Sequence, residues 1–168
     1  LVALEAIKKN LNIDGFKSVL KCIEPHENQW LEKRGIDVIR KKIEDVELEL
    51  TMELNKDDIL FVDTSHVIKP QGDLLKIFLE IFPKLKKGVI IHIHDIFTPK
   101  DYPPKWLKEE NRFYNEQYLF EVLMDHSSRY NIICSLNHLK NDHYTKLKRV
   151  CPYLNENSEP SSIYIEVI

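Results

Sequence analysis

The sequence predicts an α/β fold built around a mostly parallel sheet. The continuous apolar run Ile59–Val62 has the composition of a strand that is covered on both faces, and Val89–Ile93 is expected to be the next buried strand. The segment between them opens at Pro70 and carries apolar residues at helical spacing as far as Pro83. A strand, a helix and a second strand in this order are typical of a parallel sheet.

Further elements are expected on both sides of this core. Before it, we expect a helix from Leu1, strands at Ser18–Ile23 and Ile36–Ile39, and a surface helix over residues 44–55. After it, we expect a helix from about Asn111 to His126 and closing strands at Asn131–Leu136 and Ser162–Ile168. The helix at Leu1 begins without a capping residue, so we also expect a segment upstream of it.

Composition narrows the class of protein. With 168 residues, 43% hydrophobic and 30% charged, the chain is expected to form one domain over residues 1–168. The formal net charge of −3 gives no strong field toward nucleic acid or anionic lipid. No apolar run reaches the roughly 18 residues of a membrane helix, and the segment Leu1–Leu4 lacks the basic region and cleavage site that a signal peptide has. Three widely spaced cysteines favour a reducing compartment, so we expect a cytoplasmic protein.

Glycine is scarce. The chain has 4 glycines, whereas average usage of roughly 7% would give about a dozen. They are scattered, so this sequence contains no glycine-rich phosphate loop of the dinucleotide or P-loop type. Any nucleotide cofactor has to be held by other groups of the chain.

Three predicted strands end in carboxylates, at Glu24, Asp63 and Asp95. Ligands of open α/β sheets bind outside the carboxyl ends of the strands, so these acids are expected to line one crevice. Any one of them alone could equally cap a helix or lie solvated in a turn. The three together favour a site.

Histidines accompany two of these acids. His66 follows the strand that ends at Asp63, and His94 directly precedes Asp95. A single histidine near a strand end is more often a structural hydrogen-bonding group than a ligand. A cluster of aspartates and histidines, however, can hold a divalent metal ion, here through Asp63, His94 and Asp95. His66 could instead act as a general base without any metal.

The segment after Asp95 is rich in proline and aromatic residues. Phe97, Tyr102 and Trp106 lie in a long stretch for which we expect no regular secondary structure. Long loops of this kind are commonly functional, so these three residues are candidates for a substrate lid. Packing of the core beneath the loop is the alternative for them.

Several motifs resemble those of a known family. They are ILFVDTSH at 59–66, PKLKKGVIIHIHDIF at 83–97, Tyr102-Pro103, Trp106, and NEQY at 115–118. In this order they resemble the class I S-adenosylmethionine-dependent methyltransferases, and most of all a small-molecule O-methyltransferase branch. The resemblance implies a seven-stranded, Rossmann-like sheet with helices on both faces and an antiparallel last strand, for which Ser162–Ile168 would be a closing strand.

The resemblance also implies roles for individual residues. Glu24 matches the acid that holds the ribose hydroxyls of the cofactor, and Asp63 the acid that faces its methionine part or a metal ion. His66 lies where similar sugar O-methyltransferases place a catalytic base, and Asp95 where they place a metal-binding acid. In those enzymes the residue before that acid is a carboxylate. The imidazole of His94 at this position suits zinc, iron or nickel better than magnesium.

The beginning of the family pattern does not occur in this sequence. The family opens with a strand and a glycine-rich turn, E-x-G-x-G, and the sequence starts just after the place where they belong. That strand would lie between the strands that end at Glu24 and at Asp63. We therefore expect a fold truncated at its N-terminus, and the low glycine count follows in part from this.

The resulting functional expectation is transfer of a methyl group from S-adenosylmethionine to a hydroxyl of a small-molecule acceptor, with His66 removing the proton. Two alternatives stay open. One is a metal-dependent hydrolase or lyase that uses Asp63, His66, His94 and Asp95. The other is a non-catalytic remnant that keeps the fold.

Overall fold

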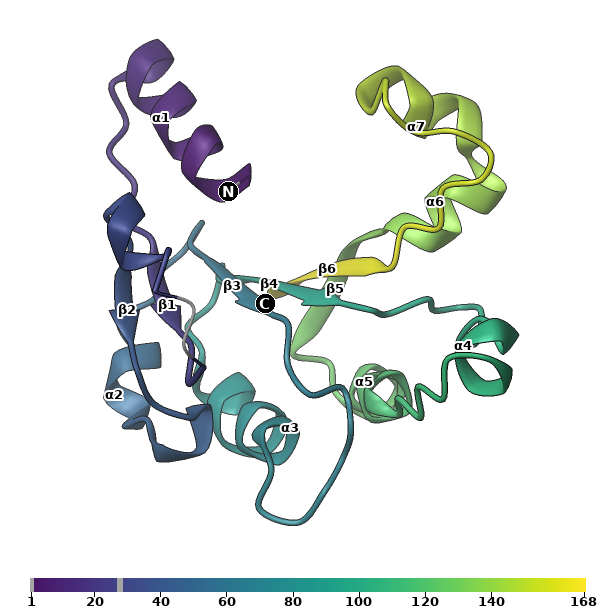
Figure 1. The fold of residues 1–168 in the computed structure, drawn as a ribbon, viewed down its shortest axis with the longest axis horizontal. Helices are drawn as coiled ribbons and strands as arrows, with labels where there is room; N and C mark the ends of the chain where they lie inside the picture. Colours follow the sequence, from purple (N-terminus) through teal and green to yellow (C-terminus); the bar gives the residue numbers. More distant parts are fainter. Residues whose placement is uncertain (1, 27–28) are drawn as a thin grey trace. The chain divides into compact units, whose positions relative to one another are not determined.

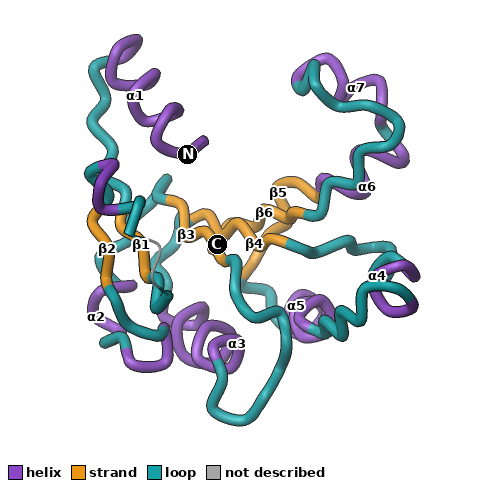
Figure 2. Tube along the Cα trace, viewed as in Figure 1, coloured by secondary structure: helices purple, strands orange, loops and turns teal. Residues whose placement is uncertain are grey.

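The computed structural model describes residues 2–26 and 29–168 and divides into two compact units, 1–46 and 47–168. Leu1, where a helix was expected to begin, lies outside the described residues. Figures 1 and 2 show the elements of both units. The expectation of one domain over residues 1–168 stays a prediction.

The first unit contains a two-stranded parallel sheet. Strand β1 (Lys21–Ile23) pairs with β2 (Asp37–Ile39), so that Ile23 lies opposite Ile39. Helix α1 (Val2–Asp14) precedes the sheet, and two 3₁₀ turns, η1 (Glu32–Arg34) and η2 (Ile43–Asp45), flank β2. Gly35 ends η1 in a left-handed conformation, with φ 78°, which glycine adopts without steric cost.

The second unit holds the larger sheet, of four strands among the described residues, in the order β3-β4-β6-β5. Its strands are β3 (Ile59–Val62), β4 (Ile90–His94), β5 (Tyr130–Ser135) and β6 (Ser162–Val167). The α-helices are α2 (Leu48–Thr51), α3 (Asp73–Leu75), α4 (Pro104–Lys108), α5 (Glu116–His126), α6 (Leu136–Asp142) and α7 (Tyr144–Val150). Helix α3 continues as the π-helix η3 (Lys76–Ile81) and then as the 3₁₀ turn η4 (Phe82–Lys84).

Strand directions in this sheet agree with the expected topology. β3 and β4 run parallel, with Val62 opposite Ile93. β6 runs antiparallel to both β4 and β5, which confirms the segment after Ser161 as an antiparallel closing strand. The pairing of β5 with β6 shifts register between Ile132 and Cys134.

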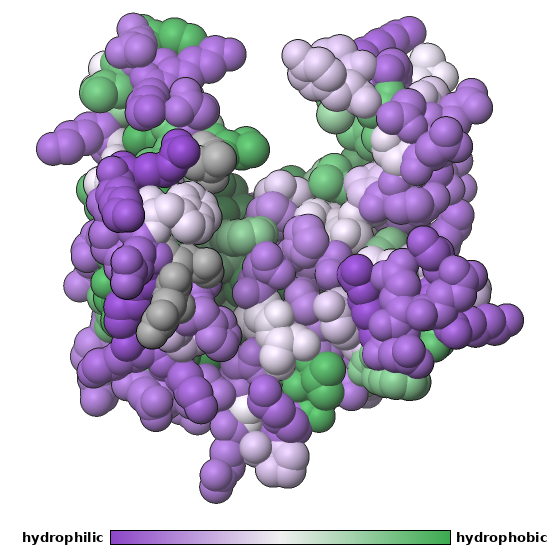
Figure 3. Space-filling model, viewed as in Figure 1, coloured by the Kyte–Doolittle hydropathy of each residue, from purple (hydrophilic) through white to green (hydrophobic). Residues whose placement is uncertain are grey.

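One face of the four-stranded sheet carries the core. Alternate residues of β4 and β6, among them Ile91, Ile93, Ile163 and Ile165, are fully buried, because successive side chains of a strand point to opposite faces. The helical segment after β3 contributes Leu74, Phe78 and Phe82 to this core. The surface drawn in Figure 3 is mainly hydrophilic, with apolar side chains in small groups.

Several element boundaries differ from those expected. The helix expected from Pro70 begins at Asp73, after Gln71 with φ 55°. The helix expected from Asn111 begins at Glu116, because Asn111 has φ 53° and no helix can pass through it. Residues 44–55 hold only short helical turns, and the loop expected between Phe97 and Trp106 leads into α4.

None of the helices within 2–26 and 29–168 has both the length and the apolar character that a bilayer-spanning segment requires.

Candidate functional site

Parallel pairing brings the ends of β3 and β4 together. Because Val62 lies opposite Ile93, the next residues, Asp63 and His94, lie side by side at the carboxyl ends of the two strands. His94 Nδ1 lies 3.7 Å from Asp63 Oδ1 and 3.1 Å from Asp95 Oδ1. The two strand-end acids of this unit therefore do meet at one edge of the sheet.

His66 lies at the centre of this group. Its Nε2 is 3.2 Å from Asp63 Oδ1 and 3.8 Å from Asp95 Oδ2, and its Nδ1 is 2.8 Å from Glu116 Oε2. The His66 side chain is 7% exposed and that of Glu116 is 1% exposed, whereas Asp63 is open to solvent. We call Asp63, His66, His94, Asp95 and Glu116 the strand-end cluster.

Local backbone geometry explains why His66 points inward. His66 has φ 58°, a left-handed conformation that turns the chain sharply four residues after the end of β3. Asp73, the first residue of α3, fixes this turn by accepting hydrogen bonds from the backbone N–H and the hydroxyl of Ser65, at 2.8 and 2.7 Å. On the neighbouring strand, Asp95 Oδ1 accepts a hydrogen bond of 2.8 Å from Ser161.

Protonation in the cluster follows from its excess of carboxylates. Burial lowers the pKa of His66, but hydrogen bonds to Asp63 and Glu116 and the negative charges of Glu116 and Asp95 outweigh it and raise the pKa to about 9. The hydrogen bond from His66 lowers the pKa of Asp63, and burial raises the pKa of Glu116. At neutral pH, His66 is therefore protonated on both nitrogens, and its positive charge is stabilised by the surrounding acids.

Three members of the cluster could hold a metal ion. One donor atom each of Asp63, His66 and His94 lies within 4.8 Å of the others. His94 Nδ1 is buried and makes no hydrogen bond to any described residue, although Asp95 Oδ1 lies 3.1 Å away. The expected third ligand, Asp95, is engaged by Ser161. Two imidazole nitrogens and one carboxylate suit zinc or iron(II) better than magnesium.

Aromatic side chains cover the cluster. Tyr114 stacks on His66, with ring centroids 4.6 Å apart, and contacts Trp106 edge to face at 5.4 Å. Phe97 and Tyr102 are 2% and 5% exposed and pack against Trp106. Phe97 and Tyr102 thus support the loop by packing, and Trp106 is half-buried. The lid role of Phe97, Tyr102 and Trp106 stays a prediction.

The first turn of α5 ties the loops after β3 and β4 together. The Asn115 N–H donates to His66 O at 3.0 Å, and Asn115 Oδ1 accepts from the Ile68 N–H at 2.6 Å. Gln117 Oε1 accepts from the Phe97 N–H at 2.8 Å, and its amide donates to Lys100 O at 2.7 Å. Among the residues that reasoning from the strand ends missed is Glu116. The signal that could have found it is the NEQY motif, which packs several polar side chains into one helix start.

The third strand-end acid, Glu24, belongs to the first unit. It follows β1 and accepts a hydrogen bond from the His26 N–H at 2.8 Å through Oε1. Arg40 donates to the backbone carbonyls of Glu24 and His26 and forms a two-point contact with Glu32, at 2.8 and 2.7 Å. This network holds the turn after β1 in place. That Glu24 lines one crevice with Asp63 and Asp95 stays a prediction.

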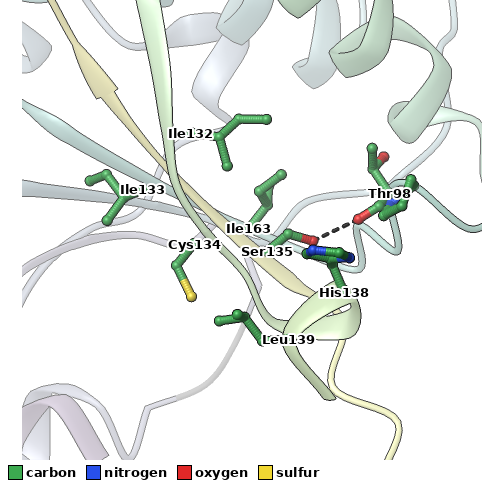
Figure 4. A pocket seen from close by; sticks show the side chains of 9 residues that line it. Thr98, Ile132, Ile133, Cys134, Ser135, His138, Leu139 and Ile163 are labelled. Carbon is green, nitrogen blue, oxygen red and sulfur yellow. Dashed lines mark hydrogen bonds between the residues drawn. The ribbon is translucent and has the colours of Figure 1, made fainter. Parts of the chain in front are cut away.

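A pocket of about 340 Å³ lies elsewhere in the second unit (Figure 4). It is lined mainly by apolar side chains of β5 and α6, and Ser135 closes one side by donating to Thr98 O at 2.6 Å. No member of the strand-end cluster lines it. The pocket lacks the converging charged groups of the cluster, so we do not assign the chemistry to it.

Comparisons with known proteins identify the family. A family model described as a methyltransferase domain matches residues 1–96. No curated protein matches the chain. Among solved structures, the plantazolicin methyltransferase BpumL, in complex with a triazolic desmethylPZN analog and SAH, matches with a TM-score of 0.54 and 14% identity, over 98% of this chain and 71% of that chain. The fold thus agrees with a class I methyltransferase, and because the family model covers more than half of the sequence, the chain belongs to the methyltransferase-domain family.

Proposed function

We propose that this protein transfers a methyl group from S-adenosylmethionine to a hydroxyl of a small-molecule acceptor. The observation that carries the proposal is the family match over residues 1–96, a segment that contains Glu24, Asp63, His66 and Asp95. Support for the cofactor comes from BpumL, which shares the fold and is in complex with SAH. A small-molecule acceptor is the type of substrate that the resemblance implies.

Two acidic residues of the chain would bind different parts of the cofactor. A carboxylate accepts two hydroxyl donors well, so Glu24 would hold the ribose of the cofactor and Asp63 would face its methionine part. Bound in this way, S-adenosylmethionine supplies a methyl group already activated by its positive sulfur. Most of the catalysis would then be alignment of the acceptor oxygen with that methyl carbon.

His66 would remove the proton of the acceptor hydroxyl through Nε2. Because the pKa of His66 is about 9 in the ligand-free protein, only a fraction of roughly one in a hundred is neutral at pH 7. Positive charge bound next to Asp63 and Asp95 opposes protonation of His66 and would increase that fraction. Asp63 and Asp95 keep His66 protonated in the absence of a ligand. Binding of a positively charged ligand beside them would therefore favour loss of the His66 proton.

Calorimetric titration with S-adenosylhomocysteine tests the proposal. We expect binding by the full chain and a loss of affinity of about tenfold or more in Glu24→Gln and in Asp63→Asn. Asp37→Asn is the matched control, because Asp37 starts β2 and lies at the opposite end of the same small sheet from Glu24. Absence of binding by the full chain, or equal binding by all variants, would overturn the proposal.

A second candidate function is a metal-dependent hydrolase or lyase. The observation that favours it is the set of donor atoms from Asp63, His66 and His94, all within 4.8 Å of one another. A metal ion held there would supply an activated water or polarise a carbonyl of the substrate. Metal analysis of protein purified without a histidine tag decides between the two: stoichiometric zinc or iron without affinity for S-adenosylhomocysteine favours the second candidate.

A further inference from the structure

We propose that Glu116 is a positioning residue that holds His66 with Nε2 turned toward Asp63 and Asp95. The proposal rests on the proposed methyl transfer, in which His66 Nε2 receives the proton. It assigns a role to a side chain that lies outside the strand ends and 50 residues further along the chain than His66. Glu116 acts through His66 and touches no reacting atom.

The environment of Glu116 indicates that stability alone does not explain it. The residue is 0% exposed. One oxygen, Oε2, lies 2.8 Å from His66 Nδ1, and the other, Oε1, is buried without a hydrogen bond to any described residue. A buried carboxylate with an unpaired oxygen destabilises a fold. Its single partner, His66, therefore indicates a functional reason for keeping it.

The contact determines which nitrogen of His66 is reactive. An ionised carboxylate only accepts hydrogen bonds, and both nitrogens of His66 face one. Glu116 Oε2 is the nearer, at 2.8 Å against 3.2 Å for Asp63 Oδ1, and it is buried whereas Asp63 is open to solvent, so Glu116 keeps a proton on Nδ1. When His66 is neutral, its lone pair then lies on Nε2, the nitrogen that is 3.2 Å from Asp63 Oδ1. Carboxylates that fix the tautomer and the orientation of a histidine in this way are common behind reactive or metal-binding imidazoles.

The neighbours of Glu116 contact His66 at its backbone and at the face of its ring. The backbone N–H of Asn115 donates to His66 O at 3.0 Å. The ring of Tyr114 stacks on the ring of His66, with an interplanar angle of 29°. Three consecutive residues before and at the start of α5 thus contact His66 through its backbone, its ring face and its Nδ1. With the ring held in this way, loss of the Glu116 carboxylate would change the tautomer while the position of the ring is retained.

Two substitutions of Glu116 distinguish the effect of its carboxylate as a hydrogen-bond acceptor from the effect of its side-chain shape. Glu116→Gln has nearly the same shape, but its amide can donate to Nδ1 and so favours the tautomer with the proton on Nε2, which is the wrong one for a base at this position. Glu116→Asp keeps a carboxylate but is shorter by one methylene. It should retain the proton on Nδ1, with a weaker hydrogen bond.

Two-bond ¹H–¹⁵N NMR of the imidazole groups in the full chain reads the tautomer directly. The spectra are taken at about pH 10, above the pKa of His66, with His66→Gln used to assign the signal. We expect a proton on Nδ1 in the wild type and in Glu116→Asp, and a shift of the proton to Nε2 in Glu116→Gln. Glu121→Gln is the control, because Glu121 also lies on α5 and accepts a hydrogen bond, from Thr98 at 2.9 Å; it should leave His66 unchanged.

The outcomes keep the two proposals apart. A wild-type His66 that carries its proton on Nε2, or a Glu116→Gln spectrum identical to that of the wild type, overturns the role of Glu116 even where S-adenosylhomocysteine binds. Conversely, a wild type that shows the expected tautomer and fails to bind S-adenosylhomocysteine overturns only the methyl transfer. If Glu116→Gln does not fold, the wild-type spectrum still decides, because the proposed role of Glu116 requires a proton on Nδ1.

Discussion

His66 and Asp95 follow different strands, yet both have a left-handed backbone, with φ 58° and 57°, and their side chains approach to 3.8 Å. Among the described residues, three other non-glycine residues, Asp57, Gln71 and Asn111, have positive φ, and all three lie in loops or turns. Left-handed conformations are unfavourable for residues with a Cβ and persist where the surrounding structure imposes them. Their coincidence at the ends of β3 and β4 indicates that the backbone is strained to bring these two side chains together.

Substitutions of Asp95 should separate this strain from the hydrogen bond to Ser161. Asp95→Asn keeps an acceptor and tolerates positive φ, so its free energy of unfolding should fall by no more than about 1 kcal/mol. Asp95→Ala should lose about 2–3 kcal/mol, because the hydrogen bond disappears and alanine is strained at this φ. Asp95→Gly should recover about 1 kcal/mol of that loss. Urea denaturation measures all three, and equal stability of the alanine and glycine variants would show that no strain is stored.

The protonation of His66 predicts how stability changes with pH in protein treated with a chelator. The pKa of His66 rises from 6.5 to about 9 on folding. Its contribution is therefore complete below pH 6.5 and is lost as the pH rises through about 9, by at most about 3 kcal/mol. Burial raises the pKa of Glu116, and an acid of this kind also loses stability as the pH rises, so both groups act in the same direction.

Urea denaturation at pH 6 and above pH 9 checks this, with Trp106 fluorescence in a Trp30→Phe background as the probe of the second unit. His66→Gln should reduce the difference between the two pH values, because it removes the titrating group. Asp63, whose pKa is lowered, changes its charge at acid pH and does not contribute in this range. A wild type that is as stable above pH 9 as at pH 6 would contradict a protonated His66.

Metal selectivity should follow from the imidazole donors. If Asp63, His66 and His94 bind an ion, the chain should prefer Zn²⁺ or Co²⁺ to Mg²⁺ by about a hundredfold or more, because nitrogen ligands suit the hard magnesium ion poorly. His94→Gln should weaken Zn²⁺ binding by about tenfold or more. His138→Gln is the control, since His138 pairs with Asp142 on α6 at 3.0 Å and lies outside the cluster. Calorimetry with each ion tests this, and tighter binding of Mg²⁺ would exclude such a site.

The strand-end part of the cluster could be predicted from the sequence, and the helix part could not. Asp63 and Asp95 follow apolar runs whose parallel pairing is a general rule, so their meeting needs no knowledge of loops. Glu116 is different: it reaches His66 only because residues 111–115 stay outside the helix and α5 starts at Glu116. That boundary depends on Asn111 with φ 53°, and on tertiary hydrogen bonds of Asn115 that helical periodicity does not contain.

The same limit applies to the aromatic loop. Composition correctly marked the segment after Asp95 as unusual, but Phe97 and Tyr102 are buried because Gln117 and Trp106 meet them from α5 and α4. Such contacts join residues 4 to 20 positions apart through tertiary packing and hydrogen bonds, and no local pattern predicts them. Short helices such as α4 are also set mainly by tertiary contacts, since isolated helices of this length are unstable.

Gln117 should be important for the stability of the second unit. It is 1% exposed, and its amide bridges the Phe97 N–H and the carbonyl of Lys100 at 2.8 and 2.7 Å. Gln117→Leu has a similar volume but leaves both backbone groups without this partner. Since each unsatisfied buried group costs about 1–3 kcal/mol, we expect a loss of about 2–4 kcal/mol in the free energy of unfolding.

Tyr118→Phe is the matched control for this prediction. Tyr118 follows Gln117 on α5 and donates a hydrogen bond to Asp101 at 2.8 Å, but it is 46% exposed. Water can replace the lost partner at an exposed site, so Tyr118→Phe should cost no more than about 0.5 kcal/mol. Urea denaturation of both variants compares a buried with an exposed set of hydrogen bonds between α5 and the loop after β4. Equal losses would mean that Gln117 does not fasten the loop after β4, and that Phe97 and Tyr102 are held by packing alone.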